Sequence, residues 1–168
     1  LFETAVREAR PLGLTTVKLT RGEPLLHPDF LTFLEVIRRE ELHLVVETNG
    51  LLCTEAVARA IASLPKRFVS VSIDGADAAT HDAIRGVAGS FDRAVEAVRH
   101  LAAAGIRPQV IFAAMRTNVG EIERLIALAG QLGAGSVKFN VVQPTARGKA
   151  LRDAGETLSV AELIALGR

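Results

Sequence analysis

The stretch SFDRAVEAVRHLAAAGIRPQVIFA, residues 90–113, contains the unit from which we predict the fold. Its first part has apolar residues at helical spacing and predicts a helix over residues 90–104. Gly105 ends that helix, and the apolar run 109–113 predicts a strand. The same order of helix, glycine and strand occurs around Gly13 and Gly133. This repeated unit is typical of an α/β chain in which helices alternate with strands.

Along the whole chain, the hydrophobic pattern predicts five strands separated by helices. The strands are expected at residues 16–20, 43–47, 68–73, 109–113 and 136–142. The helices are expected at residues 1–12, 30–40, 54–64, 90–104, 118–132 and 159–166. Thr54 is expected to cap the third helix, and Asn118 with Glu121 to form a capping box for the fifth.

The alternation predicts a single domain over residues 1–168, with parallel strands joined by right-handed crossovers. Five units are too few for a closed eight-stranded barrel, which takes about 250 residues. They fit part of a barrel or an open, doubly wound sheet. No G-x-G-x-x-G follows a strand, and no G-x-x-x-x-G-K-[ST] occurs, which weighs against a dinucleotide or P-loop site.

Composition excludes several classes of partner. The 168 residues carry a net charge of +1 without a block of like charge, so we expect no nucleic-acid partner held by phosphate contacts. No apolar run reaches the roughly 18 residues of a membrane span. The one cysteine, Cys53, allows no intrachain disulfide and no cysteine-only metal site, and the four histidines lack metal-ligand spacing. The chain does not begin with methionine, and we expect it to be part of a longer protein. The near-neutral charge and the single thiol are typical of a cytoplasmic protein, and we expect that location.

Polar residues follow every predicted strand, where α/β folds bind ligands. Thr20-Arg21-Gly22-Glu23 follows the first strand, Glu47-Thr48-Asn49-Gly50 the second and Ser72-Ile73-Asp74-Gly75 the third. Such residues also favour turns for backbone reasons alone. Their presence at all five strand ends is typical of a site that binds a small polar ligand. We call this expected site, at the carboxyl ends of the strands, the mouth.

Three of these segments resemble motifs of radical S-adenosylmethionine (radical SAM) enzymes. Residues 21–24, Arg-Gly-Glu-Pro, are similar to the family's G-G-E-P segment, and residues 48–50 to its T-N-G turn. Residues 72–75 with 81–86 resemble the stretch S-I-D-G…H-D-x-x-R-G, found in members with a SPASM-type C-terminal region. Residues 144–148 are similar to a P-x-x-R-G turn late in the same core. The matches cover about residues 1–150 in order.

The resemblance implies a partial, open six-stranded (β/α)6 barrel of which about five βα units are present. The family's reaction begins when a [4Fe–4S] cluster passes an electron to bound S-adenosylmethionine. The resulting 5′-deoxyadenosyl radical removes a hydrogen atom from the substrate, and the cofactors carry this chemistry. The motifs further imply an oxidoreductase or maturase that modifies a peptide or a cofactor precursor. Its expected partners are a peptide or small-molecule substrate and a reductant such as flavodoxin or ferredoxin.

The resemblance also implies roles for seven residues. The Gly22-Glu23 turn would receive the ammonium end of S-adenosylmethionine on its backbone carbonyls. Ser72 and Asp74 would hold the ribose hydroxyls or the methionine carboxylate, and the Arg85 guanidinium would pair with a carboxylate. Thr48 and Asn49 would lie at the same mouth.

This sequence departs from the family in two ways. The C-x-x-x-C-x-x-C segment that holds the cluster is absent, so we expect the first barrel strand and its cluster loop to precede Leu1. Arg21 stands where the family has a glycine, and its charge lies beside the site of a positively charged cofactor. The alternative is a cluster-less barrel module that binds a nucleotide-like ligand or a protein partner without catalysis.

Overall fold

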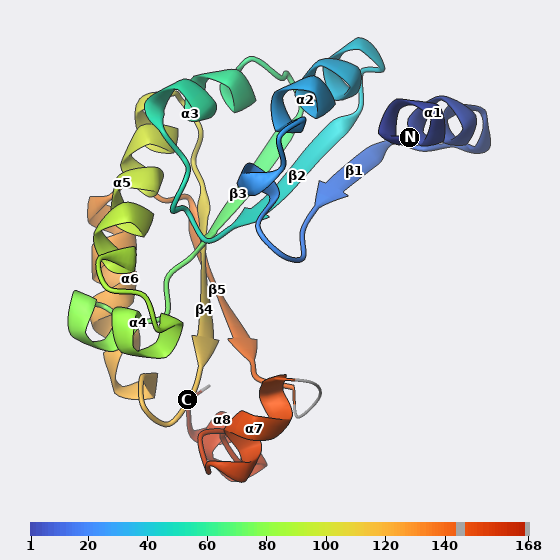
Figure 1. Ribbon diagram of the computed structural model, residues 1–168. Helices are drawn as coiled ribbons and strands as arrows, with labels where there is room; N and C mark the ends of the chain where they lie inside the picture. The colour runs from blue at the N-terminus through green and yellow to red at the C-terminus, as the bar shows by residue number, and fades with distance from the viewer. Residues whose placement is uncertain (144–146, 167–168) are drawn as a thin grey trace.

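The computed structural model describes residues 1–143 and 147–166, and its centre is one sheet of five parallel strands (Figure 1). The sheet order β1-β2-β3-β4-β5 follows the chain order. The strands are β1 (Thr16–Leu19), β2 (His43–Thr48), β3 (Arg67–Ser72), β4 (Gln109–Ala114) and β5 (Ser136–Val141). A doubly wound sheet reverses its strand order at a switch point, and here no reversal occurs among the described strands. The sheet is therefore the partial barrel that the sequence predicted, and not the doubly wound alternative.

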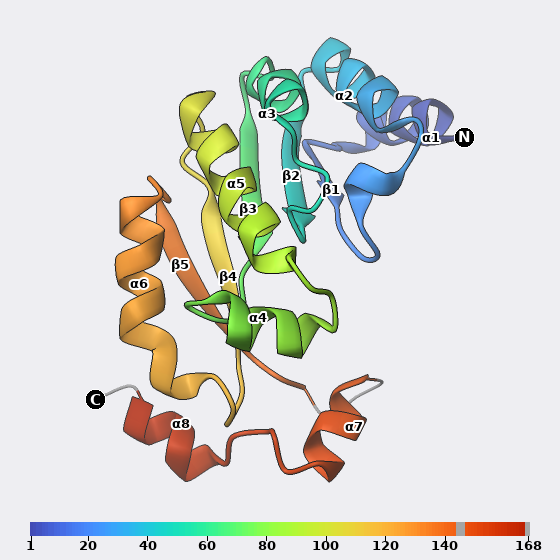
Figure 2. The ribbon, with the colours of Figure 1, turned by 60° about the vertical axis from the view of Figure 1, so that its left-hand side comes forward.

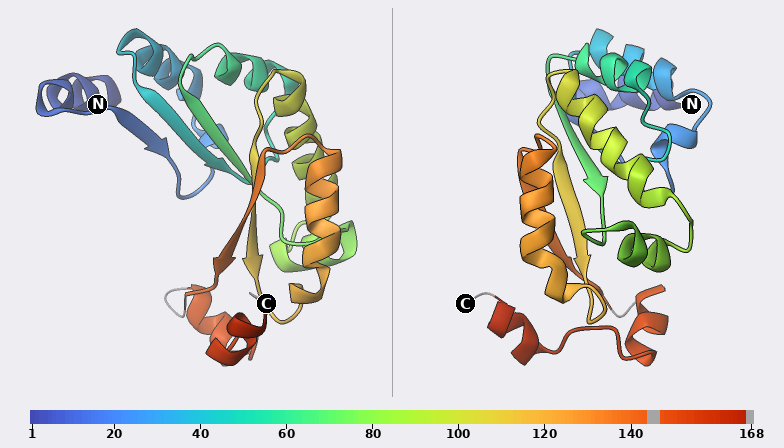
Figure 3. Two further views of the ribbon diagram at one scale, coloured as in Figure 1. Left: turned by 180° about the vertical axis from the view of Figure 1, so that it is seen from behind. Right: turned by 90° about the vertical axis from the view of Figure 1, so that its left-hand side faces the viewer.

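The helices between the strands lie on one face of the sheet (Figures 2 and 3). They are α2 (Phe30–Arg39), α3 (Glu55–Ala62), α5 (Ser90–Ala103) and α6 (Ile122–Gln131). Alternate strand residues are buried beneath them, as Leu44 and Val46 show at 0% exposure. In β2, the residues between these are only half-buried, because they face the opposite, helix-free side of the described sheet. We call that side the inner face, since it corresponds to the interior of a barrel.

The glycines of the repeated unit lie where the helices end. Gly13, Gly105 and Gly133 have φ angles of 94°, 78° and 80°, which a residue with a Cβ atom adopts at a cost. Thr54 accepts a hydrogen bond from Val57 N and caps α3 as predicted. At these positions the local sequence signals therefore predict correctly where the helices begin and end.

The helix α4 (Ala78–Arg85) was not predicted. Its sequence AATHDAIR has no apolar stripe, and His81 is its one fully buried residue. Asp77 accepts from Thr80 N at 3.1 Å and caps the helix, and Gly86 ends it with a φ of 68°. Capping and tertiary contacts therefore form α4 where periodicity gave no signal.

The remaining elements lie at the two ends of the chain and in short turns. They are α1 (Phe2–Ala9), α7 (Arg147–Asp153), α8 (Val160–Leu166) and the 3-10 turns η1 (Arg10–Leu12), η2 (Pro24–Leu26) and η3 (Val119–Glu121). No helix in the described part of the chain is long and apolar enough to cross a membrane. Residues 144–146 of the predicted P-x-x-R-G turn lie outside the described residues.

Candidate cofactor-binding site

A pocket of about 350 Å³ lies at the carboxyl ends of β2, β3 and β4. Its lining includes Asn49, Asp74, His81, Arg85, Ala113 and Met115. Three of the predicted site residues, Asn49, Asp74 and Arg85, therefore line one cavity although 36 positions separate the first from the last. The pocket is where parallel α/β folds bind ligands.

The turn after β1 contains two consecutive residues in the left-handed region. Arg21 has a φ of 66° and Gly22 a φ of 64°. A Cβ added at Gly22 would meet nothing within 4 Å, so the dihedral angle, not lack of space, favours glycine there. The glycine that the family has at position 21 is explained in the same way, because this position also has a positive φ. Arg21 adopts this conformation at a cost.

The Glu23 carboxylate joins the turn after β1 to the turn after β2. It accepts from Thr48 Oγ1 at 2.6 Å, from Asn49 N at 2.7 Å and from Leu25 N at 3.1 Å. Hydrogen bonds to a charged acceptor such as this carboxylate are stronger than those between neutral groups. The Glu23 side chain thus braces two neighbouring strand ends.

Thr48 and Asn49 stabilise the turn after β2 by hydrogen bonds within that turn. Thr48 is 4% exposed, and its Oγ1 also accepts from Gly50 N at 3.0 Å. Asn49 Oδ1 accepts from Leu51 N at 2.9 Å. Asn49 lines the pocket, whereas Thr48 does not, and the side-chain oxygens of both residues are engaged in forming the turn.

Ser72 is the last residue of β3 and lies on the inner face. Its register partner on β4 is Ile111. The side chain is half-buried, and its hydroxyl has no hydrogen-bond partner among the described residues. Of the predicted residues, Ser72 therefore has a side chain that is available to a ligand.

Asp74 and Arg85 form an ion pair at the pocket wall, with 2.7 Å between Asp74 Oδ2 and Arg85 Nη2. Asp74 is 5% exposed, and its Oδ1 accepts from Ala113 N at 2.9 Å. The Arg85 guanidinium was expected to pair with a carboxylate, and within the chain that carboxylate is Asp74. A buried carboxylate needs such a partner. The guanidinium has further N–H donors that this ion pair does not use.

His81 and Asp82, the histidine and aspartate of the H-D-x-x-R-G motif, hold the same region together. His81 is 2% exposed, and its Nδ1 accepts from Asp74 N at 3.0 Å, so its proton is on Nε2. Burial and the Arg85 charge lower the pKa of His81. Asp82 accepts from Phe91 N, Gly89 N and Ser90 Oγ, and these bonds lower its pKa. Asp82 thereby fixes the start of α5.

Asn118 is a further residue of the site that the sequence interpretation missed. It is 0% exposed, and its Nδ2 donates to Asp74 O and Ala113 O at 3.0 and 2.9 Å. Its Oδ1 accepts from Met115 N at 2.7 Å. The predicted capping box with Glu121 is wrong, because the Asn118 side chain turns back to the strand ends. Glu121 instead accepts from Ala76 N and Thr80 Oγ1 at the start of α4.

The described residues do not fit an iron–sulfur cluster. They contain no group of three or more His, Cys, Asp or Glu side chains arranged to hold a metal. Cys53 is 3% exposed, and burial together with the Glu23 charge raises its pKa to about 11. It is therefore a protonated thiol that packs as a small apolar residue.

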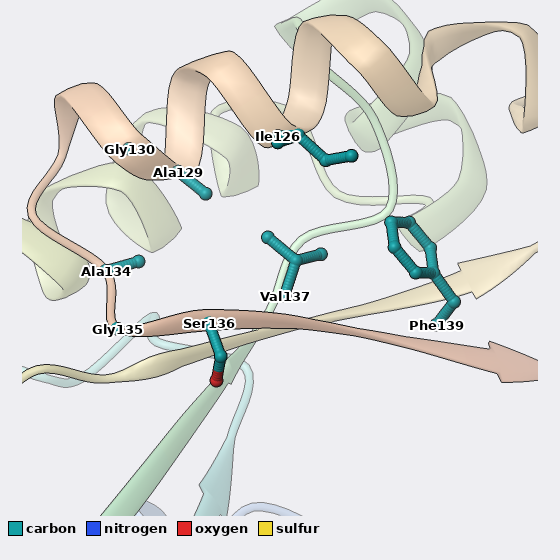
Figure 4. A pocket seen from close by; sticks show the side chains of 8 residues that line it. All are labelled: Ile126, Ala129, Gly130, Ala134, Gly135, Ser136, Val137 and Phe139. Atoms are coloured by element: carbon teal, nitrogen blue, oxygen red, sulfur yellow. The ribbon is translucent and has the colours of Figure 1, made fainter.

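A second pocket of about 310 Å³ lies between α6 and β5 on the helical face (Figure 4). Ile126, Ala129, Val137 and Phe139 give it an apolar lining. The Ser136 side chain points away from this pocket, toward the other side of β5. The pocket contains none of the predicted site residues and is separate from the mouth.

Residues 2–129 match the profile of the Radical SAM superfamily, and the chain belongs to that family. It is 33% identical over 143 residues to the AdoMet-dependent heme synthase of Methanosarcina barkeri. It is 36% identical over 144 residues to the mycofactocin maturase MftC of Mycobacterium tuberculosis, and 34% identical over 137 residues to the PqqA peptide cyclase of Gluconobacter oxydans. These matches cover 85%, 85% and 81% of the chain, but only 41%, 36% and 38% of the relatives.

Among solved structures, the chain is similar to SuiB of Streptococcus suis. The crystal structure of SuiB bound to S-adenosylmethionine superimposes with a TM-score of 0.73 at 17% identity. The match covers 82% of this chain and 32% of SuiB. At this identity the likeness establishes the fold, which is the radical SAM partial barrel.

Proposed function

We propose that this chain is the S-adenosylmethionine-binding core of a radical SAM enzyme that modifies a peptide or a cofactor precursor. The observation that carries the proposal is the pocket at the ends of β2, β3 and β4, whose walls are built by the family's own motif residues. Glu23 joins the ends of β1 and β2, and Asp74 and Asn118 join the ends of β3 and β4, so the turns at the mouth are held in place by contacts within the chain. Such preorganisation lowers the entropic cost of binding.

Each part of the mouth has a role in this proposal. The backbone carbonyls of the Gly22-Glu23 turn accept from the methionine ammonium, while the Glu23 side chain keeps that turn in place. The Ser72 hydroxyl binds the ribose hydroxyls or the methionine carboxylate. Arg85, oriented by Asp74, offers its remaining donors to the same carboxylate. When bound, the cofactor and its cluster supply the radical chemistry, and the chain's residues supply position and exclusion of water.

The substrate class is supported by the relatives. A mycofactocin maturase and a PqqA peptide cyclase are 36% and 34% identical to this chain, and one SuiB structure holds the precursor peptide SuiA. The heme synthase at 33% identity supports a cofactor precursor as the other substrate class. A flavodoxin or ferredoxin as reductant and a cytoplasmic location complete the proposal. Because the chain spans about two fifths of these relatives, the cluster ligands are sought outside it.

The first test is calorimetric titration of the chain with S-adenosylmethionine. Saturable binding is expected, and Ser72→Ala should weaken it by about 1–3 kcal/mol, the value of one buried polar contact. Ser63→Ala, at the exposed end of α3, is the matched control and should bind as the parent does. Equal affinity of all three proteins would remove Ser72 from the site.

The second test uses the full-length protein after anaerobic reconstitution with iron and sulfide. Under a strong reductant it should convert S-adenosylmethionine to 5′-deoxyadenosine. S-adenosylmethionine binding without cleavage would instead support the cluster-less binding module.

A further inference from the structure

The inner face of the sheet carries a charged cluster that the cofactor site does not use. Lys18 Nζ lies 2.7 Å from Glu47 Oε1, and Thr20 Oγ1 donates to Glu47 Oε2 at 2.8 Å. The Lys18 and Thr20 hydrogen bonds and the nearby Lys138 charge lower the pKa of Glu47. The carboxylate is thus paired with Lys18, and Lys138 adds a second positive charge on the same face, which leaves these three side chains with an excess positive charge.

Lys138 is the member of this cluster that has no ion-pair partner among the described residues. It is exposed and lies on β5 between Val137 and Phe139, which line the apolar pocket on the helical face. Because successive side chains alternate, Lys138 extends from the inner face, on the same side as Ser136 in Figure 4. Its ammonium is therefore free to bind an anion in the barrel interior.

The strand register places Lys138 next to the proposed cofactor. Lys138 pairs with Ile111, and Ile111 pairs with Ser72. Two strand spacings of about 4.8 Å separate the Lys138 and Ser72 backbones by about 10 Å. A group bound to Lys138 would lie beside a cofactor bound at Ser72. Ile111 lies between Ser72 and Lys138 in the sheet and is 8% exposed, so the surface between these two residues is apolar.

We propose that Lys138 binds a carboxylate of the substrate, and that the substrate of this site is therefore an acid. This inference rests on the proposed function, since it places the substrate beside S-adenosylmethionine. A carboxylate forms a charge-assisted hydrogen bond with an ammonium. Glu47 is already paired with Lys18, so the Lys138 ammonium remains available to an acid. A neutral analogue lacks this charge–charge attraction.

The test compares an acidic probe with its neutral analogue by NMR titration of the chain in the presence of S-adenosylmethionine. The probes are the dipeptides N-acetyl-Ala-Glu-amide and N-acetyl-Ala-Gln-amide, with glutarate as a small acid. The acidic dipeptide should shift the backbone amide signals of Lys138 and Ile111 saturably and bind about tenfold more tightly than the neutral one. Tighter binding of the dipeptide than of glutarate indicates a peptide acid, and equal binding indicates that a small acid suffices.

Two variants decide whether Lys138 is the residue responsible. Lys138→Met should reduce the affinity for the acid to that for the neutral dipeptide. Lys66→Met, an exposed lysine just before β3, should keep the full preference. Equal binding of acid and amide, or a preference that survives Lys138→Met, would overturn the proposal. If the acid preference fails while S-adenosylmethionine still binds, only this inference is lost; failure to bind S-adenosylmethionine is evidence against the proposed function itself.

Discussion

At the scale of single residues, the motif side chains mainly hold one another in place. Glu23 accepts from Thr48 and Asn49, Asp74 pairs with Arg85, and His81 accepts from the Asp74 backbone. Motif segments far apart in the sequence therefore meet at one pocket. Most of their polar side chains are engaged within the chain, because a buried polar group must first satisfy its own hydrogen bonds.

Arg21→Gly should raise the free energy of unfolding by about 1 kcal/mol, because a non-glycine residue at a φ of 66° is strained. Affinity for S-adenosylmethionine should be unchanged or higher, since a positive charge beside a cationic ligand is removed. Urea denaturation and calorimetry measure the two effects. Arg38→Gly, inside helix α2, is the control and should destabilise by about 1 kcal/mol. Loss of cofactor binding in Arg21→Gly would identify Arg21 as a ligand group.

His81 should make stability depend on pH. The pKa of His81 is lowered in the native state. Below the ordinary value of about 6.5, the unfolded chain therefore binds a proton at His81 that the native state does not bind, and this favours unfolding. The His81 contribution is complete above that value and is lost as the pH falls toward the native pKa. His81→Asn keeps an acceptor for Asp74 N but cannot titrate. Urea denaturation at about pH 7.5 and 5 should show a smaller loss of stability in the variant; identical losses would contradict this role.

At the scale of secondary-structure elements, α4 and the loop after β4 depend on contacts far away in sequence. Glu121 holds the start of α4 through Ala76 N and Thr80 Oγ1, and Asn118 joins the loops after β3 and β4. The periodicity of the chain contains no signal for these contacts. Helix α4 was missed for this reason, and Asn118 was assigned to a local cap.

Asn118→Ala should lower the free energy of unfolding by about 3 kcal/mol, since it leaves buried polar groups of Met115, Asp74 and Ala113 unpaired. Asn118→Asp should be comparably destabilised, because its carboxylate would face two carbonyl oxygens. Asn140→Ala, half-buried on β5, is the control and should change stability little. Denaturation curves measure all three. Wild-type stability of Asn118→Ala would show that the loops are joined by other contacts.

At the scale of the whole molecule, the described sheet is open and ends at β1 and β5. Strand β1 forms one edge of the described sheet, since it pairs only with β2 among the described strands. This strand is only partly apolar: Val17 and Leu19 pack against the core, and the exposed Lys18 faces the other way. An unpaired strand edge still offers its backbone to other chains.

The isolated chain should therefore be marginally stable and associate with increasing concentration. Sedimentation velocity over a range of concentrations should show species larger than the monomer, and thermal unfolding should be broad. A monomer at every concentration that melts in one sharp transition would contradict the expectation.

The sequence by itself determined the class of fold and the order of the five strands along the chain. It could do so because helix periodicity, the glycines at helix ends and the turn motifs are local features. Cys53 as a packed thiol and the Thr54 cap follow from equally local rules.

Only the tertiary structure decided how the motif residues are used. It chose the sequential strand order of a partial barrel, paired Arg85 with Asp74, and turned Asn118 away from its expected cap toward the strand ends. It also brought Lys18, Glu47 and Lys138, from three different strands, to one inner face. Each of these outcomes depends on which segments become neighbours in space, and that is settled by the packing of the sheet and its helices as a whole.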